Sequence, residues 1–126
     1  MYDHVGLNVS DYEVSKQFYE RTLAALGYSV QMELTEWKTA GFGTEGVATD
    51  FWIGEREPRS AAIHVAFQAP DRATVDAFHA AGLAAGGTDN GAPGVREVYH
   101  PTYYGAYVLD PDGNNVEASH RQRRAA

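Results

Sequence analysis

The stretch 61–72, AAIHVAFQAPDR, follows the same plan as residues 1–12, MYDHVGLNVSDY, near the start of the chain. In both stretches a histidine begins a run in which apolar residues alternate with small or polar ones, and an aspartate comes soon afterwards. Such alternation predicts a β-strand with one buried face. Because a chain that repeats its own plan folds as repeated units, this correspondence predicts a domain made of two paired modules.

The correspondence continues into a predicted helix after each strand. Equivalent residues include Asp11 and Asp71, Phe18 and Phe78, and Leu23 and Leu83. Ser10 and Glu13 fit a capping box, in which both side chains bind free amides at the start of a helix. Asp71 is the expected cap of the second helix, and glycines at 27 and 86–87 are the expected helix stops.

Shorter strand-like runs follow each helix. We expect strands at about 28–34, 37–42 and 47–53 in the first half, and at 103–109 and 115–119 in the second. The last two are joined by DPDG (110–113), a sequence typical of a type I turn. The breaker-rich stretch 86–101 is predicted to be mostly irregular.

These patterns predict a single α+β domain over 1–126, built of two βαβββ modules at about 1–56 and 61–120. Residues 54–60 are the expected linker. The strands are expected to form a cupped mixed sheet with the helices on its outer face.

Composition excludes several function classes. The 126 residues carry a formal net charge of −7, which argues against nucleic acid as a partner. There is no cysteine, so disulfides and thiolate metal sites are excluded. No apolar run approaches the ~18–20 residues of a membrane span, and no signal-peptide pattern opens the chain. We therefore expect a cytoplasmic protein with neither a nucleic-acid nor a membrane partner.

The polar faces of the predicted strands carry the candidate chemistry. One face of each repeated strand presents a histidine, a small residue and an amide, in the order His4, Gly6, Asn8 and His64, Ala66, Gln68. On the last strand, Glu117 points to the same side as Asn115 and Ser119. If the strands curl into one sheet, His4, His64 and Glu117 meet in a cleft. Two imidazoles and one carboxylate suit divalent iron or manganese, and three ligands plus water also suit catalytic zinc.

Four motifs give the chain a resemblance to the vicinal oxygen chelate superfamily over essentially its full length. They are DHVGLNVSD at 3–11, FYE at 18–20, IHVAF at 63–67 and YVLDPDGNNVE at 107–117. The resemblance implies paired βαβββ modules around a divalent ion (iron, manganese, zinc or nickel), with His4, His64 and Glu117 as ligands. The family's fourth ligand falls near Trp52, which cannot bind a metal, although Asp50 lies two residues away.

Among the family's activities, the resemblance slightly favours extradiol-dioxygenase-like chemistry on a small substrate bound through vicinal oxygens. It implies a substrate hydrogen bond from Tyr107 and an acid or base role for His100. The alternatives are a glyoxalase-like isomerase or lyase and a fosfomycin-type transferase. A further alternative is a metal-free protein of the bleomycin-resistance type, which would sequester a flat ligand among its aromatic residues.

Oligomeric assembly bears on how such a site is built. Two-module chains of this type often pair, so a homodimer is expected. The site could then lie within one chain or be shared between two, and the sequence leaves both arrangements open.

Overall fold

The computed structural model describes residues 2–122 and confirms the α+β architecture of two βαβββ modules. The first module contains β1 (Val5–Val9), α1 (Tyr12–Ala24), β2 (Ser29–Leu34), the short 3₁₀ helix η1 (Thr35–Trp37), β3 (Thr39–Gly43) and β4 (Thr49–Glu55). The second contains β5 (His64–Gln68), α2 (Arg72–Ala84), β6 (Thr88–Val95), β7 (Tyr104–Leu109) and β8 (Asn115–His120). No helix within 2–122 is long and apolar enough to cross a membrane.

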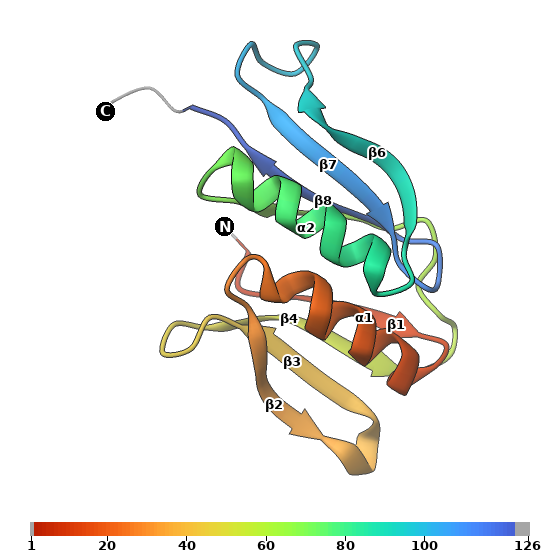
Figure 1. Ribbon diagram of the computed structural model, residues 1–126. Helices are drawn as coiled ribbons and strands as arrows, with labels where there is room; N and C mark the ends of the chain where they lie inside the picture. The colour runs from red at the N-terminus through yellow and green to blue at the C-terminus, as the bar shows by residue number, and fades with distance from the viewer. Residues whose placement is uncertain (1, 123–126) are drawn as a thin grey trace.

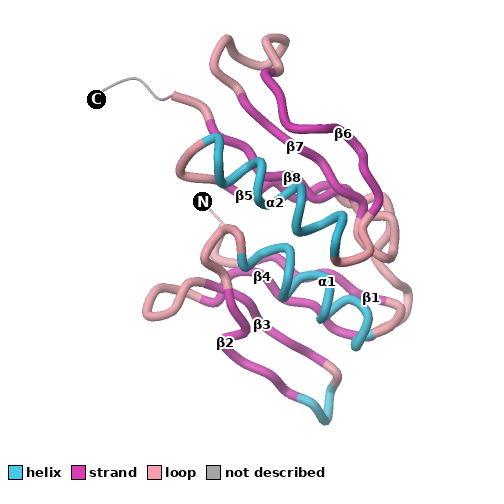
Figure 2. Tube along the Cα trace, in the orientation of Figure 1, coloured by secondary structure: helices cyan, strands magenta, loops and turns pink. Residues whose placement is uncertain are grey.

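Each module forms its own four-stranded mixed sheet. The strand orders are β1-β4-β3-β2 and β5-β8-β7-β6, so the two modules have the same topology. In each, the first strand runs parallel to the last strand of the module, and the remaining pairs are antiparallel. The two helices lie side by side, each across one face of its own sheet (Figures 1 and 2).

A single hydrophobic core joins the modules. Leu7 and Val9 of β1 are buried, as the alternation predicts, and Phe67 of β5 occupies the corresponding place in the second module. The ring of Phe67 meets that of Phe51 edge to face, with centroids 5.3 Å apart, and also packs edge to face on Tyr28. A helix packs on the apolar face of each sheet. The opposite, more polar face is therefore available to form a binding site.

The N-cap residue of α2 is the one predicted from the sequence, and that of α1 lies one residue after the predicted one. Asp71 caps α2, because its carboxylate accepts hydrogen bonds from the backbone N–H and the hydroxyl of Thr74. At α1 the cap is Asp11, which accepts from the N–H of Val14, and not Ser10 as expected. The backbone N–H of Ser10 instead donates to Asp112, so this residue ties the helix entry to the other module.

The stretch predicted to be irregular contains a strand, so that prediction was wrong. β6 spans Thr88–Val95 and pairs with β7, with register shifts between Asp89 and Gly91 and again before Gly94. These shifts absorb the glycines that interrupt the strand pattern, because an extra residue can be accommodated as a bulge. Only the segment after β6, up to the start of β7, is a loop.

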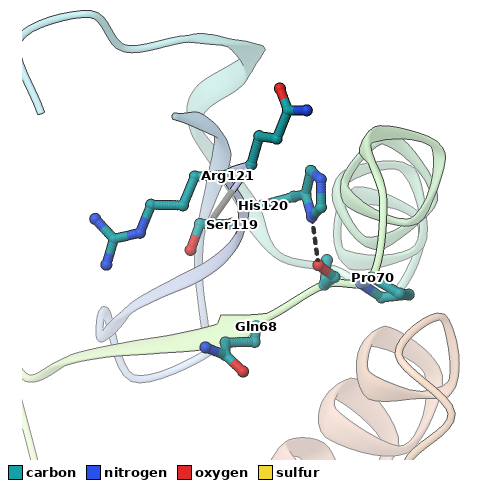
Figure 3. Close-up of a pocket in the computed structure, with 7 residues that line it drawn as sticks. Gln68, Pro70, Ser119, His120 and Arg121 are labelled. Carbon is teal, nitrogen blue, oxygen red and sulfur yellow. Dashed lines mark hydrogen bonds between the residues drawn. The ribbon is translucent and has the colours of Figure 1, made fainter. Parts of the chain in front are cut away.

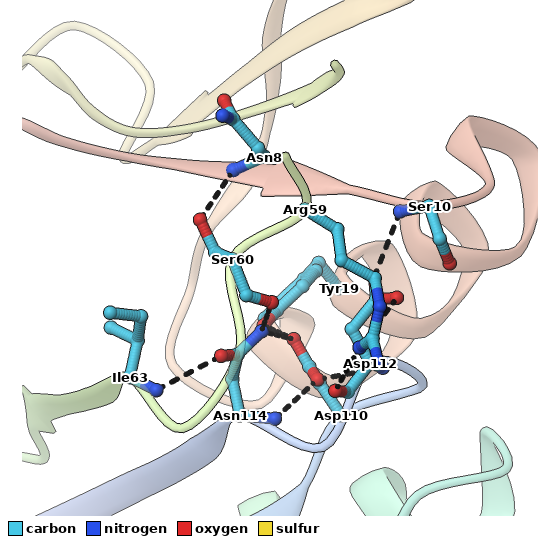
Figure 4. Close-up of polar contacts among 9 residues, drawn as sticks. All are labelled: Asn8, Ser10, Tyr19, Arg59, Ser60, Ile63, Asp110, Asp112 and Asn114. Carbon is cyan, nitrogen blue, oxygen red and sulfur yellow. Dashed lines mark hydrogen bonds and ion pairs between the residues drawn. The ribbon is translucent and has the colours of Figure 1, made fainter. Parts of the chain in front are cut away.

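Buried polar contacts around the turn between β7 and β8 hold the modules together (Figure 4). The hydroxyl of Tyr19 on α1 donates to Asp110, with the two oxygens 2.5 Å apart, and neither residue is exposed. Burial and the neighbouring Asp110 raise the pKa of Tyr19, so its hydroxyl remains a donor. The other Asp110 oxygen accepts from the backbone N–H groups of Asp112 and Asn114.

The same network fixes the start of β5. The side-chain oxygen of Asn114 accepts from the N–H of Ile63, and the N–H of Asn115 donates to the Ile63 carbonyl. Ile63 immediately precedes His64, so these bonds hold His64 at a defined place beside β8.

Candidate functional site

The first and last strands of each module pair in the same register, so each position in one module has an equivalent in the other. In the second module Ala66 lies beside Glu117, and in the first Gly6 lies beside Trp52. Trp52 therefore occupies the position that Glu117 occupies in its own module. A module with a carboxylate and a module with an indole at this place cannot form the same kind of site.

The structure brings His64 and Glu117 together. Nε2 of His64 lies 3.1 Å from Oε1 of Glu117, and the Glu117 side chain is only 3% exposed whereas that of His64 is about half exposed. Two ligand atoms bound at about 2.1 Å to one octahedral ion stand about 3 Å apart. The spacing of this pair therefore fits two neighbouring ligands of a divalent ion.

The hydrogen bond that Nδ1 of His64 makes determines whether Nε2 can accept. Nδ1 lies 3.1 Å from the backbone carbonyl oxygen of Asn115. A carbonyl can only accept, so Nδ1 carries the hydrogen and Nε2 of the neutral ring presents a lone pair. That lone pair and the Glu117 carboxylate are both acceptors, so they face each other favourably only when a proton or a cation lies between them. Metal-bound histidines commonly have this backbone anchor.

Two tyrosines complete the surroundings of the pair. The hydroxyl of Tyr103 donates to Oε2 of Glu117, which leaves Oε1 directed at His64. Tyr107 lies beside Glu117 in the sheet, and its ring is stacked near that of His64 with an interplanar angle of 28°. Burial, followed by the charge of Glu117, raises the pKa of Tyr107. Burial and the Glu117 hydrogen bond raise that of Tyr103. Both hydroxyls therefore remain protonated donors at neutral pH.

These residues line a cavity of about 740 Å³, which we call the module-two cavity. Its wall consists of His64, Val98, Tyr99, Tyr103, Tyr107, Asn115, Glu117 and Arg121. The side-chain oxygen of Asn115 is buried without a hydrogen-bond partner among the described residues. The cavity thus combines an aromatic wall with a few polar groups, as small-molecule sites usually do.

His4 is not part of this cavity. Its ring is more than half exposed, and Nδ1 lies 2.8 Å from the neighbouring Asp3 carboxylate. It lines a separate hollow of about 440 Å³ that also includes Tyr28 and Asp50. Within residues 2–122 no three histidine, aspartate or glutamate side chains gather as a metal site. Within one chain, therefore, two of the three expected ligands meet and the third stands apart.

The first module offers no carboxylate at the position of Glu117. A Cβ added to Gly41 would lie 2.9 Å from two atoms of the six-membered ring of Trp52, so the indole lies directly against this glycine. Asp50 is held by the hydroxyl of Tyr28 at 2.9 Å, and its second oxygen is buried without a partner among the described residues. The hydrogen bond from Tyr28 therefore holds Asp50 in the hollow that His4 also lines, and Asp50 does not line the module-two cavity that contains Glu117.

His100 does not line the module-two cavity. It lies in the loop between β6 and β7, where its Nδ1 accepts from the backbone N–H of Thr102 at 3.1 Å. Of the two residues with expected catalytic roles, the structure brings Tyr107 to the His64–Glu117 pair and leaves His100 outside the cavity.

Sequence reasoning gave Tyr103 and Arg121 no role beside the predicted metal ligands. A signal for Arg121 was present, because the alternation that places Glu117 and Ser119 on one face continues to position 121. Tyr103 begins the strand expected at 103–109, where alternation places it on the same side as Tyr107, although β7 itself begins one residue later. Only the structure shows that its hydroxyl contacts Glu117.

Comparison with known proteins identifies the family that shares this fold. Residues 2–118 match the family model described as Glyoxalase/Bleomycin resistance protein/Dioxygenase superfamily. A search of curated proteins found no match.

Solved structures with the same fold include three from this group. A glyoxalase/bleomycin resistance protein from Albidiferax ferrireducens is 34% identical, with a TM-score of 0.80, and the match covers 97% of this chain and 99% of that one. A glyoxalase-related enzyme from Fulvimarina pelagi is 16% identical, with a TM-score of 0.73 and coverage of 96% and 88%. A glyoxalase/bleomycin resistance protein/dioxygenase family enzyme from Burkholderia phytofirmans is 18% identical, with a TM-score of 0.69 and coverage of 95% and 98%. From the family match and the relative at 34% identity, the chain belongs to the glyoxalase/bleomycin resistance protein/dioxygenase superfamily.

Proposed function

We propose that this protein is a metal-dependent enzyme acting on a small substrate that binds through two adjacent oxygens. The observation that carries the proposal is the pairing of His64 and Glu117. An anchored imidazole directs its lone pair at a buried carboxylate 3.1 Å away. A divalent ion held by both groups would remove the conflict of two facing acceptors, as would a proton on His64, and the 3.1 Å spacing expected of two ligands of one ion supports the metal.

His64 and Glu117 would supply two ligands and His4 of a second copy the third. Supporting this arrangement, His4 is exposed immediately before β1, the strand that corresponds to β5, and lies outside the module-two cavity of its own chain. A twofold-related copy could bring the first module of one chain over the second module of its partner, as symmetric dimers do. The bound ion would act as a Lewis acid that holds the two substrate oxygens side by side.

The residues of this chain have separate roles in the proposed reaction. Tyr103 holds the Glu117 carboxylate in one orientation through its hydroxyl. Tyr107 keeps its proton because of burial and the nearby Glu117, so it can donate a hydrogen bond to a substrate oxygen. The tyrosine-lined cavity would hold a flat substrate.

Extradiol-dioxygenase-like chemistry remains slightly favoured over the isomerase, lyase and transferase alternatives. Trp52 stands at the position of a fourth protein ligand, which argues for a three-ligand site with open positions. His100 lies outside the module-two cavity, so we keep the substrate hydrogen bond from Tyr107 as the expected role and assign no acid or base role to His100. Reconstitution with Fe²⁺ without oxygen, followed by catechol and oxygen, would separate these alternatives. Ring-cleavage product supports the dioxygenase, and its absence favours the other activities.

Mixing two inactive variants tests the shared site. His4→Ala and His64→Ala would each lose the metal. In a mixed dimer, one of the two sites takes its His4 from the His64→Ala chain and its His64 from the His4→Ala chain, so that site has both histidines. We expect mixing after partial unfolding to restore Mn²⁺ binding that neither variant shows alone. No restoration would contradict a site shared between chains.

Metal-free binding is the second candidate function. It is favoured by the three tyrosines that line the module-two cavity, Tyr99, Tyr103 and Tyr107, because aromatic faces bind flat ligands without a metal. Ligand affinity that does not change on metal removal or in His64→Ala would favour this function over the enzyme.

A further inference from the structure

A second pocket lies along the same sheet face as the His64–Glu117 pair. Gln68 and Ser119 are neighbours in the parallel pairing of β5 and β8, two residues beyond Ala66 and Glu117. Alternate strand residues share a face, and two residues span about 7 Å. The Gln68 and Ser119 side chains therefore stand on the same face as Glu117, one step further along.

This second pocket, which we call the distal pocket, has a volume of about 410 Å³. It shares Arg121 with the module-two cavity, so the guanidinium borders both spaces. In Figure 3 the Gln68, Ser119 and Arg121 side chains extend to one side of the strands. His120 turns to the other side, where Nδ1 donates to the Ala69 carbonyl (Figure 3).

The chemistry of the distal pocket suits an anion. An amide, a hydroxyl and a guanidinium all offer hydrogen-bond donors. Arg121 lies over the ring of Tyr103, 5.6 Å from its centroid. The ion pairs within residues 2–122 use other cations, so Arg121 has no acidic partner in the described part of the chain. In a protein of net charge −7, such an arginine at a cavity is a local centre of positive potential.

We propose that the distal pocket binds a carboxylate carried by the substrate, through Arg121, Ser119 and Gln68. This inference rests on the proposed function, because it supposes that the adjacent oxygens of the same molecule bind beside His64 and Glu117. The substrate class is then a small anion with two adjacent oxygens at one end and a carboxylate at the other. Arg121 is the specificity-determining residue, because a guanidinium binds a carboxylate through two parallel hydrogen bonds.

Two probes that differ only by a carboxylate test the inference. Catechol and 3,4-dihydroxybenzoate are titrated into the Mn²⁺-loaded protein by calorimetry. We expect the acid to bind more tightly, and Arg121→Gln to reduce the preference for the acid over catechol about 10-fold or more, because a hydrogen bond to a charged group contributes about 1.5–3 kcal/mol. Arg121→Lys should restore part of the preference, since it keeps the charge but not the paired hydrogen bonds.

Arg72→Gln is the matched control. Arg72 also stacks on a tyrosine, with its guanidinium 4.9 Å from the ring centroid of Tyr104, but it lines neither the distal pocket nor the module-two cavity. Equal affinity of the native protein for both probes, or equal losses in Arg72→Gln and Arg121→Gln, would overturn the inference.

A metal-free measurement separates failure of this inference from failure of the proposed function. Benzoate titrated into the metal-free protein should shift the NMR signals of the Gln68 side-chain amide in the native chain but not in Arg121→Gln. If catechol binding proves independent of Mn²⁺ while these shifts occur, the metal proposal fails and the carboxylate site stands. If the metal is required but the Gln68 signals do not move, the carboxylate site is overturned.

Discussion

His64 and Glu117 meet across two parallel strands, with Nε2 of the ring 3.1 Å from Oε1 of the carboxylate. The ring is anchored from behind by the carbonyl of Asn115, and the carboxylate is anchored by the hydroxyl of Tyr103. Because both partners are fixed from outside the pair, the space between them is defined before any ligand arrives. Such preorganisation is what metal and catalytic sites require.

Removing the Tyr103 hydroxyl should weaken metal binding. Tyr103→Phe leaves Oε2 of Glu117 without its donor, so the carboxylate can rotate away from His64. Loss of such an outer partner typically reduces metal affinity about 10–100-fold. Mn²⁺ titration followed by calorimetry measures the change. Tyr99→Phe is the control, since Tyr99 lines the same cavity without contacting Glu117 through a hydrogen bond in the described chain. An equal effect of both changes would refute the role given to Tyr103.

The Tyr19 hydroxyl should stabilise the fold more than the Tyr12 hydroxyl does, because the partner of Tyr19 is buried and the partner of Tyr12 is partly exposed. Tyr19→Phe removes the hydroxyl donor from the buried Asp110 carboxylate, whose Oδ2 then keeps only the side-chain amide of Asn114 as a donor, and a hydrogen bond to a charged group contributes about 1.5–3 kcal/mol. Tyr12→Phe removes a bond of equal length to Glu33, whose side chain is 30% exposed and reachable by water. Urea unfolding should therefore give a clearly larger loss for Tyr19→Phe, and similar losses would contradict the account of the buried network.

The absence of a side chain at Gly41 is expected to make room for the indole of Trp52. In Gly41→Ala the new Cβ would lie 2.9 Å from the indole and 2.5 Å from Thr49, and overpacking of this kind costs about 1–3 kcal/mol. In Gly6→Ala, on β1 at the other side of β4, the nearest atom would be 3.9 Å away, an ordinary contact. Thermal unfolding should show a lower midpoint for Gly41→Ala only. A stable Gly41→Ala variant would mean that the indole moves freely.

Asp71 should make stability depend on pH. Hydrogen bonds from the Thr74 hydroxyl and backbone N–H hold the pKa of Asp71 below its ordinary value of 3.8. A carboxyl whose pKa is lowered by folding stabilises the native state above its unfolded pKa, and this contribution is lost as the pH falls through the lower folded value. Asp71→Ala should thus be less stable than the native chain at pH 7, with a difference that shrinks toward pH 3.

Glu45→Ala, which removes an exposed carboxylate from a turn, is the control for that experiment. Its stability should follow the native chain at every pH. A constant difference between Asp71→Ala and the native chain from pH 7 to pH 3 would show that the cap acts without its charge.

Much of the fold follows from local patterns in the sequence. The repeated alternation after His4 and His64 predicts two equivalent strands, and the register of Ala66 with Glu117 agrees with the predicted face. The caps were harder, because Ser10 and Asp11 are both good cap residues and a tertiary contact to Asp112 decides between them. The strand at 88–95 escaped detection because bulges, rather than local propensity, accommodate its glycines.

The site was only partly predictable for a physical reason. Strand alternation specifies which face a side chain occupies, and it therefore found His64 and Glu117. It does not specify how two sheets face each other, so it could not show that His4 lies in a separate hollow of the same chain. Alternation over 103–109 places Tyr103 on the same side as Tyr107, but it does not specify that the Tyr103 hydroxyl reaches Glu117.

The most direct test of the central claim is the metal content of the native protein, purified without chelators or a histidine tag and then supplied with divalent ions. We predict about one divalent ion per chain, lost in His64→Ala and in Glu117→Gln and retained in His100→Ala, whose ring lies outside the module-two cavity. A native protein that binds no divalent ion after reconstitution, or a His64→Ala variant that binds as much as the native chain, would contradict the claim.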